Sequence, residues 1–332
     1  MSFKSFASLL LFCGAAFCFP GSSYGQKMLQ PKEKREYAMR LLQKYNADGW
    51  KIIKQVDSLA LHPPFDRFAE GDTEFDVRNA VGTMVHEMNH SYGALLAWKM
   101  KPKDARNHMC YYLTNDDHRL VRYTPVFPTQ QMGRTIPKNL RTFRFETYIF
   151  NPKEEIALTS NVLGIYGLLD EWVAYYQGAL TDVKMHCWYE ENTPGNAEDW
   201  YDYFSNVGSA INAHQEFRFY CLAYLLYAQK HQPGMYKEMM RNEEMVETLL
   251  KVNELFSGLL LKYDIIKENV FGKLRAKGVK IVEDDEWIFL NRYGAGNYLV
   301  EYKILEKEMA KPAYQQMLQN LKNANKIALY KK

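Results

Sequence analysis

Cysteine is scarce in this chain, and its spacing excludes two common kinds of protein scaffold. The 332 residues include five cysteines, of which Cys13 and Cys18 lie in an apolar N-terminal segment. The other cysteines, Cys110, Cys187 and Cys221, can form at most one disulfide and leave one thiol over. No two cysteines have the C-x-x-C spacing of a zinc cluster. The sequence therefore indicates neither a disulfide-stapled domain nor a cysteine-based zinc fold.

Strong charge and long apolar runs are also missing. The net charge of +3 is close to neutral for this length, so nothing favours nucleic acid or an acidic membrane surface as a partner. Beyond the N-terminal segment, no stretch is apolar enough to cross a bilayer, and we find no internal repeat. With 47% apolar and 14% aromatic residues, the chain can bury a sizeable core. We expect one large domain or two closely packed lobes.

The N-terminus has the pattern of a signal peptide. Lys4 precedes an apolar run over residues 5–19, and Ser23-Tyr24-Gly25 is a small-x-small cleavage site before Gln26. The run is too short to be a comfortable membrane span. We predict that residues 1–25 are removed and that the protein is exported, to the periplasm or outside the cell, with no transmembrane segment afterwards. A retained N-terminal anchor is the alternative.

Residue patterns along the rest of the chain predict a mainly helical α+β fold. Helical spacing covers residues 31–61 with a break at 46–49, then a helix that starts at residues 72–73, and then 159–177, 197–230, 235–274 and 299–322, the last of them kinked at Pro312. Strand-like segments cover residues 108–113, 120–123, 140–150, 279–282 and 287–290, and residues 293–298 look like a glycine loop. We expect a lobe over residues 26–190 with a small antiparallel sheet, and a mainly helical lobe over 197–332.

The helix that starts at residues 72–73 carries the motif that indicates a function. His86-Glu87-x-x-His90 places two imidazoles one helical turn apart, which suits two corners of a tetrahedral zinc site, with a glutamate beside them. Gly82 and Gly93 lie on the same face as the histidines. Because glycine costs roughly 1 kcal/mol in a helix relative to alanine, these positions predict the close approach of another helix or of a substrate.

The motif helix has a clear start and a clear core face. Thr73 and Asp76 have the spacing of a capping box. An apolar stripe then follows at helical spacing, formed by Val77, Val81, Met84, Val85 and Met88. The pattern predicts a stable helix that packs this stripe on the core.

The third ligand is predicted on the next long helix. Glu171 lies in Leu169-Asp170-Glu171-Trp172-Val173-Ala174-Tyr175-Tyr176, on a face that also carries Gly164, Gly167 and Tyr175. Together with the first motif, this segment resembles the gluzincin metallopeptidases, particularly the aminopeptidase-like branch, which carry L-N-E-x-x-A-x-Y after H-E-x-x-H. Asp170 stands where asparagine is usual. The resemblance implies a zincin-like catalytic core and zinc held by His86, His90 and Glu171.

The resemblance also implies a role for each of these residues. Glu87 would act as general base towards a zinc-activated water and return the proton to the leaving amine. His86 and His90 would bind zinc as neutral imidazoles whose second nitrogens donate to other groups, and Asp170 could accept one such bond. The substrate implied is a peptide or protein, which an exposed edge strand of the sheet could hold.

Several alternatives stay open from the residues alone. Each of the three motif residues also suits an ordinary solvated helix, and Glu171 could be a surface or capping carboxylate. His118 is a reserve ligand, whereas His108 and His186 are better explained as structural or surface residues. For stabilising an oxyanion, His214 and Tyr220 are both candidates. The protein could also be a non-catalytic binding or structural protein that retains the fold, or a hydrolase of another amide, such as a cell-wall bond.

Overall fold

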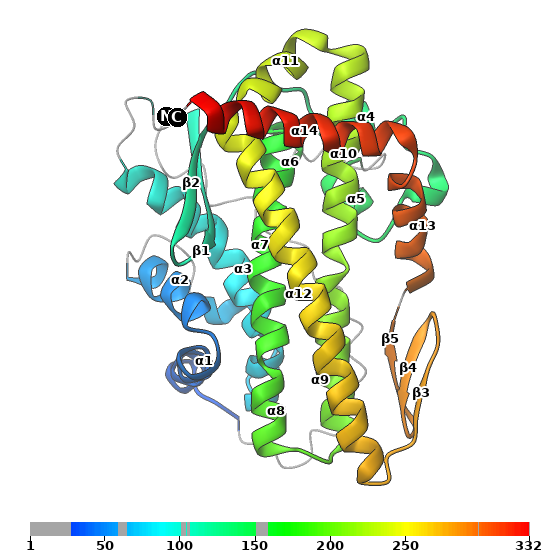
Figure 1. Cartoon of the computed structure of the whole chain (residues 1–332). Helices are drawn as coiled ribbons and strands as arrows, with labels where there is room; N and C mark the ends of the chain where they lie inside the picture. The colour runs from blue at the N-terminus through cyan, green and yellow to red at the C-terminus, as the bar shows by residue number, and fades with distance from the viewer. Residues whose placement is uncertain are drawn as a thin grey trace.

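A mainly helical architecture with two small antiparallel sheets is formed by the described residues (Figure 1). The computed structural model describes residues 28–58, 65–100, 104, 107–150, 159–297 and 299–331. The helices are α1 (Pro31–Tyr45), α2 (Ala47–Asp57), α3 (Glu74–Lys99), α4 (Thr129–Gly133), α5 (Phe145–Tyr148), α6 (Thr159–Val162), α7 (Ile165–Lys184), α8 (His186–Asn192), α9 (Ala197–Ile211), α10 (Ala213–His231), α11 (Pro233–Arg241), α12 (Glu243–Ala276), α13 (Leu299–Met309) and α14 (Pro312–Lys331). The strands are β1 (His108–Thr114), β2 (Asp117–Arg122), β3 (Ile281–Glu283), β4 (Trp287–Leu290) and β5 (Tyr293–Gly296).

Helix α7 occupies the centre of the molecule (Figure 1). It packs against α3, the motif helix, and also against α9, α10 and α12 of the C-terminal half. Helices α1 and α2 and the β1–β2 hairpin pack on α3. One continuous apolar cluster runs through both halves. The α3–α7 interface is therefore fixed from both sides, which is what a site shared between two helices requires.

Local signals set the start and the orientation of α3, as the sequence predicts. Thr73 Oγ1 accepts from the backbone N–H of Asp76 at 3.1 Å, and the N–H of Thr73 donates to the Asp76 carboxylate at 2.9 Å. This reciprocal capping box is confirmed. The predicted apolar stripe is buried throughout, and it consists of Val77, Val81, Met84, Val85 and Met88.

The prediction of a strand over residues 140–150 is wrong, although the β1–β2 hairpin is confirmed. The segment forms a 3-10 turn (Lys138–Leu140) and the short helix α5. The alternating pattern fails because Phe143 is 69% exposed whereas Arg144 is buried. A helical turn lets Arg144, Phe145 and Tyr148 all point inward, and the buried partner of Arg144 lies on a distant helix.

The predicted helix over residues 159–177 has wrong boundaries at both ends. Gly164 separates α6 from α7, with φ of 55°, and a Cβ there would collide with the Tyr224 hydroxyl group and the Phe127 carbonyl. Gly178 does not end the helix. A Cβ on Gly178 would lie 3.0 Å from the Gly82 carbonyl oxygen and 3.2 Å from the His86 Cβ. It is a point of close approach between α7 and α3.

Three further boundaries in the C-terminal half differ from the prediction. Residues 197–230 form two helices, α9 and α10, which meet at Asn212. The predicted glycine loop is strand β5, which pairs with β4 next to the confirmed β3–β4 hairpin. Pro312 begins α14 rather than kinking a single helix, in keeping with the preference of proline for the first helical turn.

Other sequence predictions concern the chain ends and the cysteines. The predicted signal peptide, residues 1–25, lies outside the described residues. Among the residues that are described, no helix combines the length and the apolar content needed to cross a lipid bilayer. Cys110, Cys187 and Cys221 are free thiols, and Cys221 is fully buried, as its aromatic surroundings suggest.

Candidate metal centre

Helix α3 presents the two histidines of the motif side by side. His86 and His90 are one turn apart, their ring centroids are 5.1 Å apart, and the rings are nearly perpendicular, at 82°. Their Nε2 atoms lie 3.4 Å from each other. Two ring nitrogens that face each other this closely on one side of a helix can bind the same ion.

Helix α7 brings Glu171 to the same point. Glu171 Oε2 lies 3.7 Å from Nε2 of His86 and 3.5 Å from Nε2 of His90. Together with the 3.4 Å between the two nitrogens, these sides form a triangle whose centre is about 2.0 Å from each corner, close to the bond length of zinc to nitrogen and oxygen ligands. Geometrically, His86, His90 and Glu171 form a group that could hold a metal ion.

The chemistry of the Glu171 oxygen also fits a cation. Glu171 Oε2 is buried and has no hydrogen-bond partner among the described residues. A buried carboxylate oxygen without a donor is costly unless a positive charge compensates it. Two imidazole nitrogens and one carboxylate oxygen are a known donor set for catalytic zinc, which keeps a fourth position open. The residues present therefore fit a divalent metal ion.

His90 is oriented by a hydrogen bond to a carboxylate. Its Nδ1 lies 2.8 Å from Asp170 Oδ2, the partner that the sequence suggests. Burial lowers the pKa of His90, but the negative charges of Asp170 and Glu171 outweigh burial and raise that pKa well above its ordinary value. This arrangement fixes the ring and leaves Nε2 pointing at the Glu171 oxygen.

His86 has a different environment. Burial, together with the positive charges of His90 and Arg144, lowers the pKa of His86 well below its ordinary value. The ring of Tyr175 packs edge-on against the His86 ring, with centroids 4.4 Å apart. His86 is thus held as a neutral imidazole, which is the form that binds metal ions.

Glu87 lies beside the ligands and is partly buried. Burial is the main reason that the pKa of its carboxyl group is raised, and the nearby Glu171 carboxylate adds to the shift, while His90 opposes it. A carboxylate whose pKa moves towards neutrality is better suited to accept and release a proton at ordinary pH.

The two residues that the sequence offers for stabilising an oxyanion, His214 and Tyr220, are both buried in the core. His214 is buried between Trp172 and Phe256 and contacts Ser257 at 3.1 Å. Tyr220 contacts Thr142 at 3.1 Å. The role of either residue in stabilising an oxyanion stays a prediction.

Among the described residues, the other histidines that the sequence singles out lie outside the group of His86, His90 and Glu171. His118 is exposed on β2, and His108 and His186 contact backbone carbonyls of Asp104 and Val183. The site is therefore built without any of the reserve residues.

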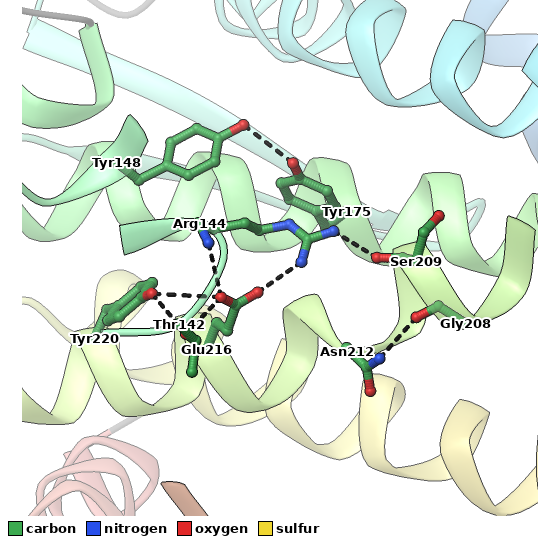
Figure 2. A network of polar contacts seen from close by, with 9 residues as sticks. All are labelled: Thr142, Arg144, Tyr148, Tyr175, Gly208, Ser209, Asn212, Glu216 and Tyr220. Atoms are coloured by element: carbon green, nitrogen blue, oxygen red, sulfur yellow. Dashed lines mark hydrogen bonds and ion pairs between the residues drawn. The ribbon is translucent and has the colours of Figure 1, made fainter. Parts of the chain in front are cut away.

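Sequence reasoning missed a polar network next to the site (Figure 2). The hydroxyl groups of Tyr175 and Tyr148 form a hydrogen bond of 3.1 Å, and the guanidinium carbon of Arg144 lies 4.5 Å from the centre of the Tyr175 ring. Arg144 forms an ion pair with Glu216 at 2.6 Å, and both are buried. The sequence places Tyr175 on the same face as Glu171, one turn later, but it does not indicate Arg144, because the partner of Arg144 is far along the chain.

A separate cavity of about 180 Å³ lies among α8, α9 and α12. It is lined by Glu190, Pro194, Trp200, Val270, Lys273 and Leu274. None of these residues belongs to the group of three ligands, and along α7 alone the site is roughly 20 Å from the start of α8. The cavity is therefore separate from the candidate metal centre.

Comparison of the chain with models of protein families, with curated proteins and with solved structures gives no match in any of the three. Function must therefore be argued from the site itself, from its donor atoms, their geometry and their surroundings.

Proposed function

We propose that this protein is an exported zinc-dependent peptidase of gluzincin type, which hydrolyses amide bonds with Glu87 as the general base. The observation that carries the proposal is the convergence of three donor atoms, from His86, His90 and Glu171, with mutual distances of 3.4 to 3.7 Å. A further glutamate stands beside them, as hydrolysis requires and a purely structural metal site does not.

The donor set favours zinc over other common ions. Magnesium and calcium prefer six or more oxygen ligands, whereas two imidazoles with one carboxylate suit zinc with an open position. When bound, a divalent ion of this kind supplies a Lewis acid that polarises a carbonyl group and makes water more acidic.

Each residue of the site has its own role in the proposed reaction. The carboxylate of Glu87 takes a proton from the attacking water and delivers it to the nitrogen of the leaving amine. His86 binds through Nε2 as a neutral ring, and its lowered pKa supports that form. Asp170 accepts from Nδ1 of His90, which keeps the Nε2 of that ring directed at the site.

The experiment compares metal content and turnover in three proteins: wild type, Glu87→Gln and Glu74→Gln. Glu74 lies exposed on the first turn of the same helix and serves as the matched control. We expect about one zinc per chain in all three by elemental analysis. Turnover of a pool of quenched fluorescent peptides should fall about 10²–10⁴-fold in Glu87→Gln alone, the usual contribution of a general base.

Two results would contradict the proposal. Wild-type protein that binds no zinc when it is supplied would favour the non-catalytic alternative. The second result is a zinc-loaded wild type that leaves every peptide intact but cleaves another amide, such as a cell-wall fragment. In that case the metal site and the general base would stand, and the proposed substrate class would be wrong.

A further inference from the structure

The two imidazoles of the metal centre are oriented by different kinds of neighbour. Nδ1 of His90 is held by Asp170 at 2.8 Å. For His86, the part of the chain that the structure describes provides no hydrogen bond to Nδ1; the contact that it does provide is the edge-on ring of Tyr175, at 4.4 Å and 71°. Metal-binding histidines are ordinarily oriented through their second nitrogen, so His86 needs another constraint.

Packing can supply that constraint. The χ2 torsion of a histidine is broad, so the ring can turn unless its neighbours prevent it. On the side of α3 that faces α7, the Cβ of His86 lies against Gly178, and the Tyr175 ring lies against the imidazole. A turn of the His86 ring would move Nε2 away from Glu171 Oε2, which is 3.7 Å away.

The Tyr175 ring is itself held on several sides (Figure 2). Its hydroxyl group contacts that of Tyr148 at 3.1 Å. The guanidinium carbon of Arg144 lies 4.5 Å from the ring centre, and the ring of Phe217 lies 5.3 Å away. A ring fixed by one hydrogen bond, one cation and one aromatic neighbour has little freedom to move.

Arg144 is anchored in turn to the C-terminal half. Its Nη1 donates to Glu216 Oε2 at 2.6 Å, its Nη2 to the Ser209 carbonyl oxygen at 2.5 Å, and its backbone N–H to Glu216 Oε1 at 2.9 Å. Ser209 is in the last turn of α9 and Glu216 in the first turn of α10. The cation behind Tyr175 is therefore fixed at the junction of these two helices.

We propose that Tyr175 is the positioning residue of His86, and that Tyr148 and Arg144 hold Tyr175 in place for this purpose. The inference rests on the proposed metal centre and deepens it. It assigns the two histidines different supports: His90 is held by a charged hydrogen bond, and His86 by an aromatic ring that is braced against α9 and α10.

The test measures metal affinity and ligand geometry rather than turnover. Zinc affinity is determined by competition with a chelator, and cobalt is used as a probe because its absorption spectrum reports the ligand arrangement. We expect Tyr175→Leu to weaken zinc binding by roughly 10–100-fold, the range for residues that orient metal ligands, and to alter the cobalt spectrum. Tyr175→Phe keeps the ring and should lose less.

The matched control is Tyr176→Leu. Tyr176 is the next residue on α7, is buried in the core and packs on Phe256 instead of the ligands. It should lower the melting temperature of the metal-free protein without changing zinc affinity or the cobalt spectrum. Equal zinc affinities for Tyr175→Leu and Tyr176→Leu would overturn the inference, as would equal losses for Tyr175→Leu and Tyr175→Phe.

A second variant keeps the inference testable if Tyr175→Leu does not fold. Tyr148→Phe removes one hydroxyl group and leaves the ligands untouched. We expect a changed cobalt spectrum and a smaller loss of zinc affinity; an unchanged spectrum and affinity would overturn the role of Tyr148. A wild-type protein that binds neither ion would instead refute the metal centre itself, so the two failures can be told apart.

Discussion

Two buried polar clusters lie close together in this molecule, and they differ in how their buried carboxylates are compensated. In the first, at the α3–α7 interface, Glu171 Oε2 has no hydrogen-bond partner among the described residues. In the second, at the α9–α10 junction, both oxygens of Glu216 are bonded to Arg144, through its backbone N–H and its guanidinium group. Both oxygens of Glu216 therefore have donors, although Arg144 Nε has no partner among the described residues, whereas Glu171 Oε2 has no donor at all.

The difference separates a buried ion pair that stabilises the fold from a buried carboxylate that is available to bind a cation. A buried charge is tolerated when an opposite charge and hydrogen bonds compensate it, as Arg144 does for Glu216. Around Glu171, the nearby carboxylates of Asp170 and Glu87 add negative charge, and the rings of His86 and His90 are the nearest counterweight. A divalent cation would complete that balance, which is why the incomplete cluster is the one to which we assign a function.

Breaking the buried ion pair of Arg144 and Glu216 should have the largest effect. Glu216→Gln leaves the buried Arg144 without its counter-charge, and we expect the free energy of unfolding of the metal-free protein to fall by about 3–5 kcal/mol. Urea denaturation measures this value. Glu254→Gln is the control, because Glu254 is 69% exposed and forms a surface ion pair with Lys251, so its loss should be below about 1 kcal/mol. Similar losses in both variants would contradict the contrast.

A comparison of two buried histidines sharpens the contrast. His90 has carboxylate neighbours that raise its pKa, whereas burial lowers the pKa of His214 to about 3, and Arg218 adds to that shift. Below pH 6.5 the unfolded chain binds a proton at His214 that the folded chain does not bind until about pH 3. The contribution of His214 to the free energy of unfolding is therefore fully present above pH 6.5 and is lost as the pH falls towards 3, by up to about 5 kcal/mol.

The measurement for His214 compares two denaturation series across pH. Wild type and His214→Gln are unfolded with guanidinium at steps between pH 7 and pH 4, and the difference between their free energies of unfolding is plotted. We expect the wild type to lose more stability than the variant on acidification. Parallel curves would show that His214 does not titrate differently in the two states.

Removing the uncompensated carboxylate should act on metal binding instead of folding. Glu171→Gln replaces an anionic ligand by a neutral one, and we expect zinc affinity to fall by more than about 100-fold, beyond the loss typical of residues that only orient ligands. Chelator competition measures it, with Glu238→Gln on the exposed face of α11 as the control. Zinc affinity that is the same in both variants would remove Glu171 from the ligand set.

The smallest of these effects is expected at Asp170. Asp170→Asn keeps a hydrogen-bond acceptor for Nδ1 of His90 but removes the negative charge, so zinc affinity should fall by about 10-fold. In the metal-free protein the pKa of His90 should move down, because the Asp170 charge is a main cause of its rise. Proton NMR titration of the imidazole checks the second expectation, and an unshifted His90 would contradict it.

Part of the fold and part of the site could be predicted because they depend on neighbours in sequence. The capping box of Thr73 and Asp76 and the one-turn spacing of His86 and His90 are local. The strand prediction for residues 140–150 is wrong because the local pattern contains no information about Glu216. The buried ion pair with the Glu216 carboxylate places Arg144 in the interior. Gly178 was misjudged because a glycine that ends a helix and one that admits another helix look the same in a sequence.

By itself, the sequence determined a capped helix that carries two imidazoles on one face and a carboxylate beside them, since helical spacing alone fixes those positions. Only the tertiary structure decided that Glu171 meets them, because that contact depends on the packing of α3 against α7 through Gly82 and Gly178. It likewise decided that Tyr175 faces His86 and that a buried cation lies behind it. Such contacts depend on how distant surfaces fit together, and the order of residues within one helix does not contain that information.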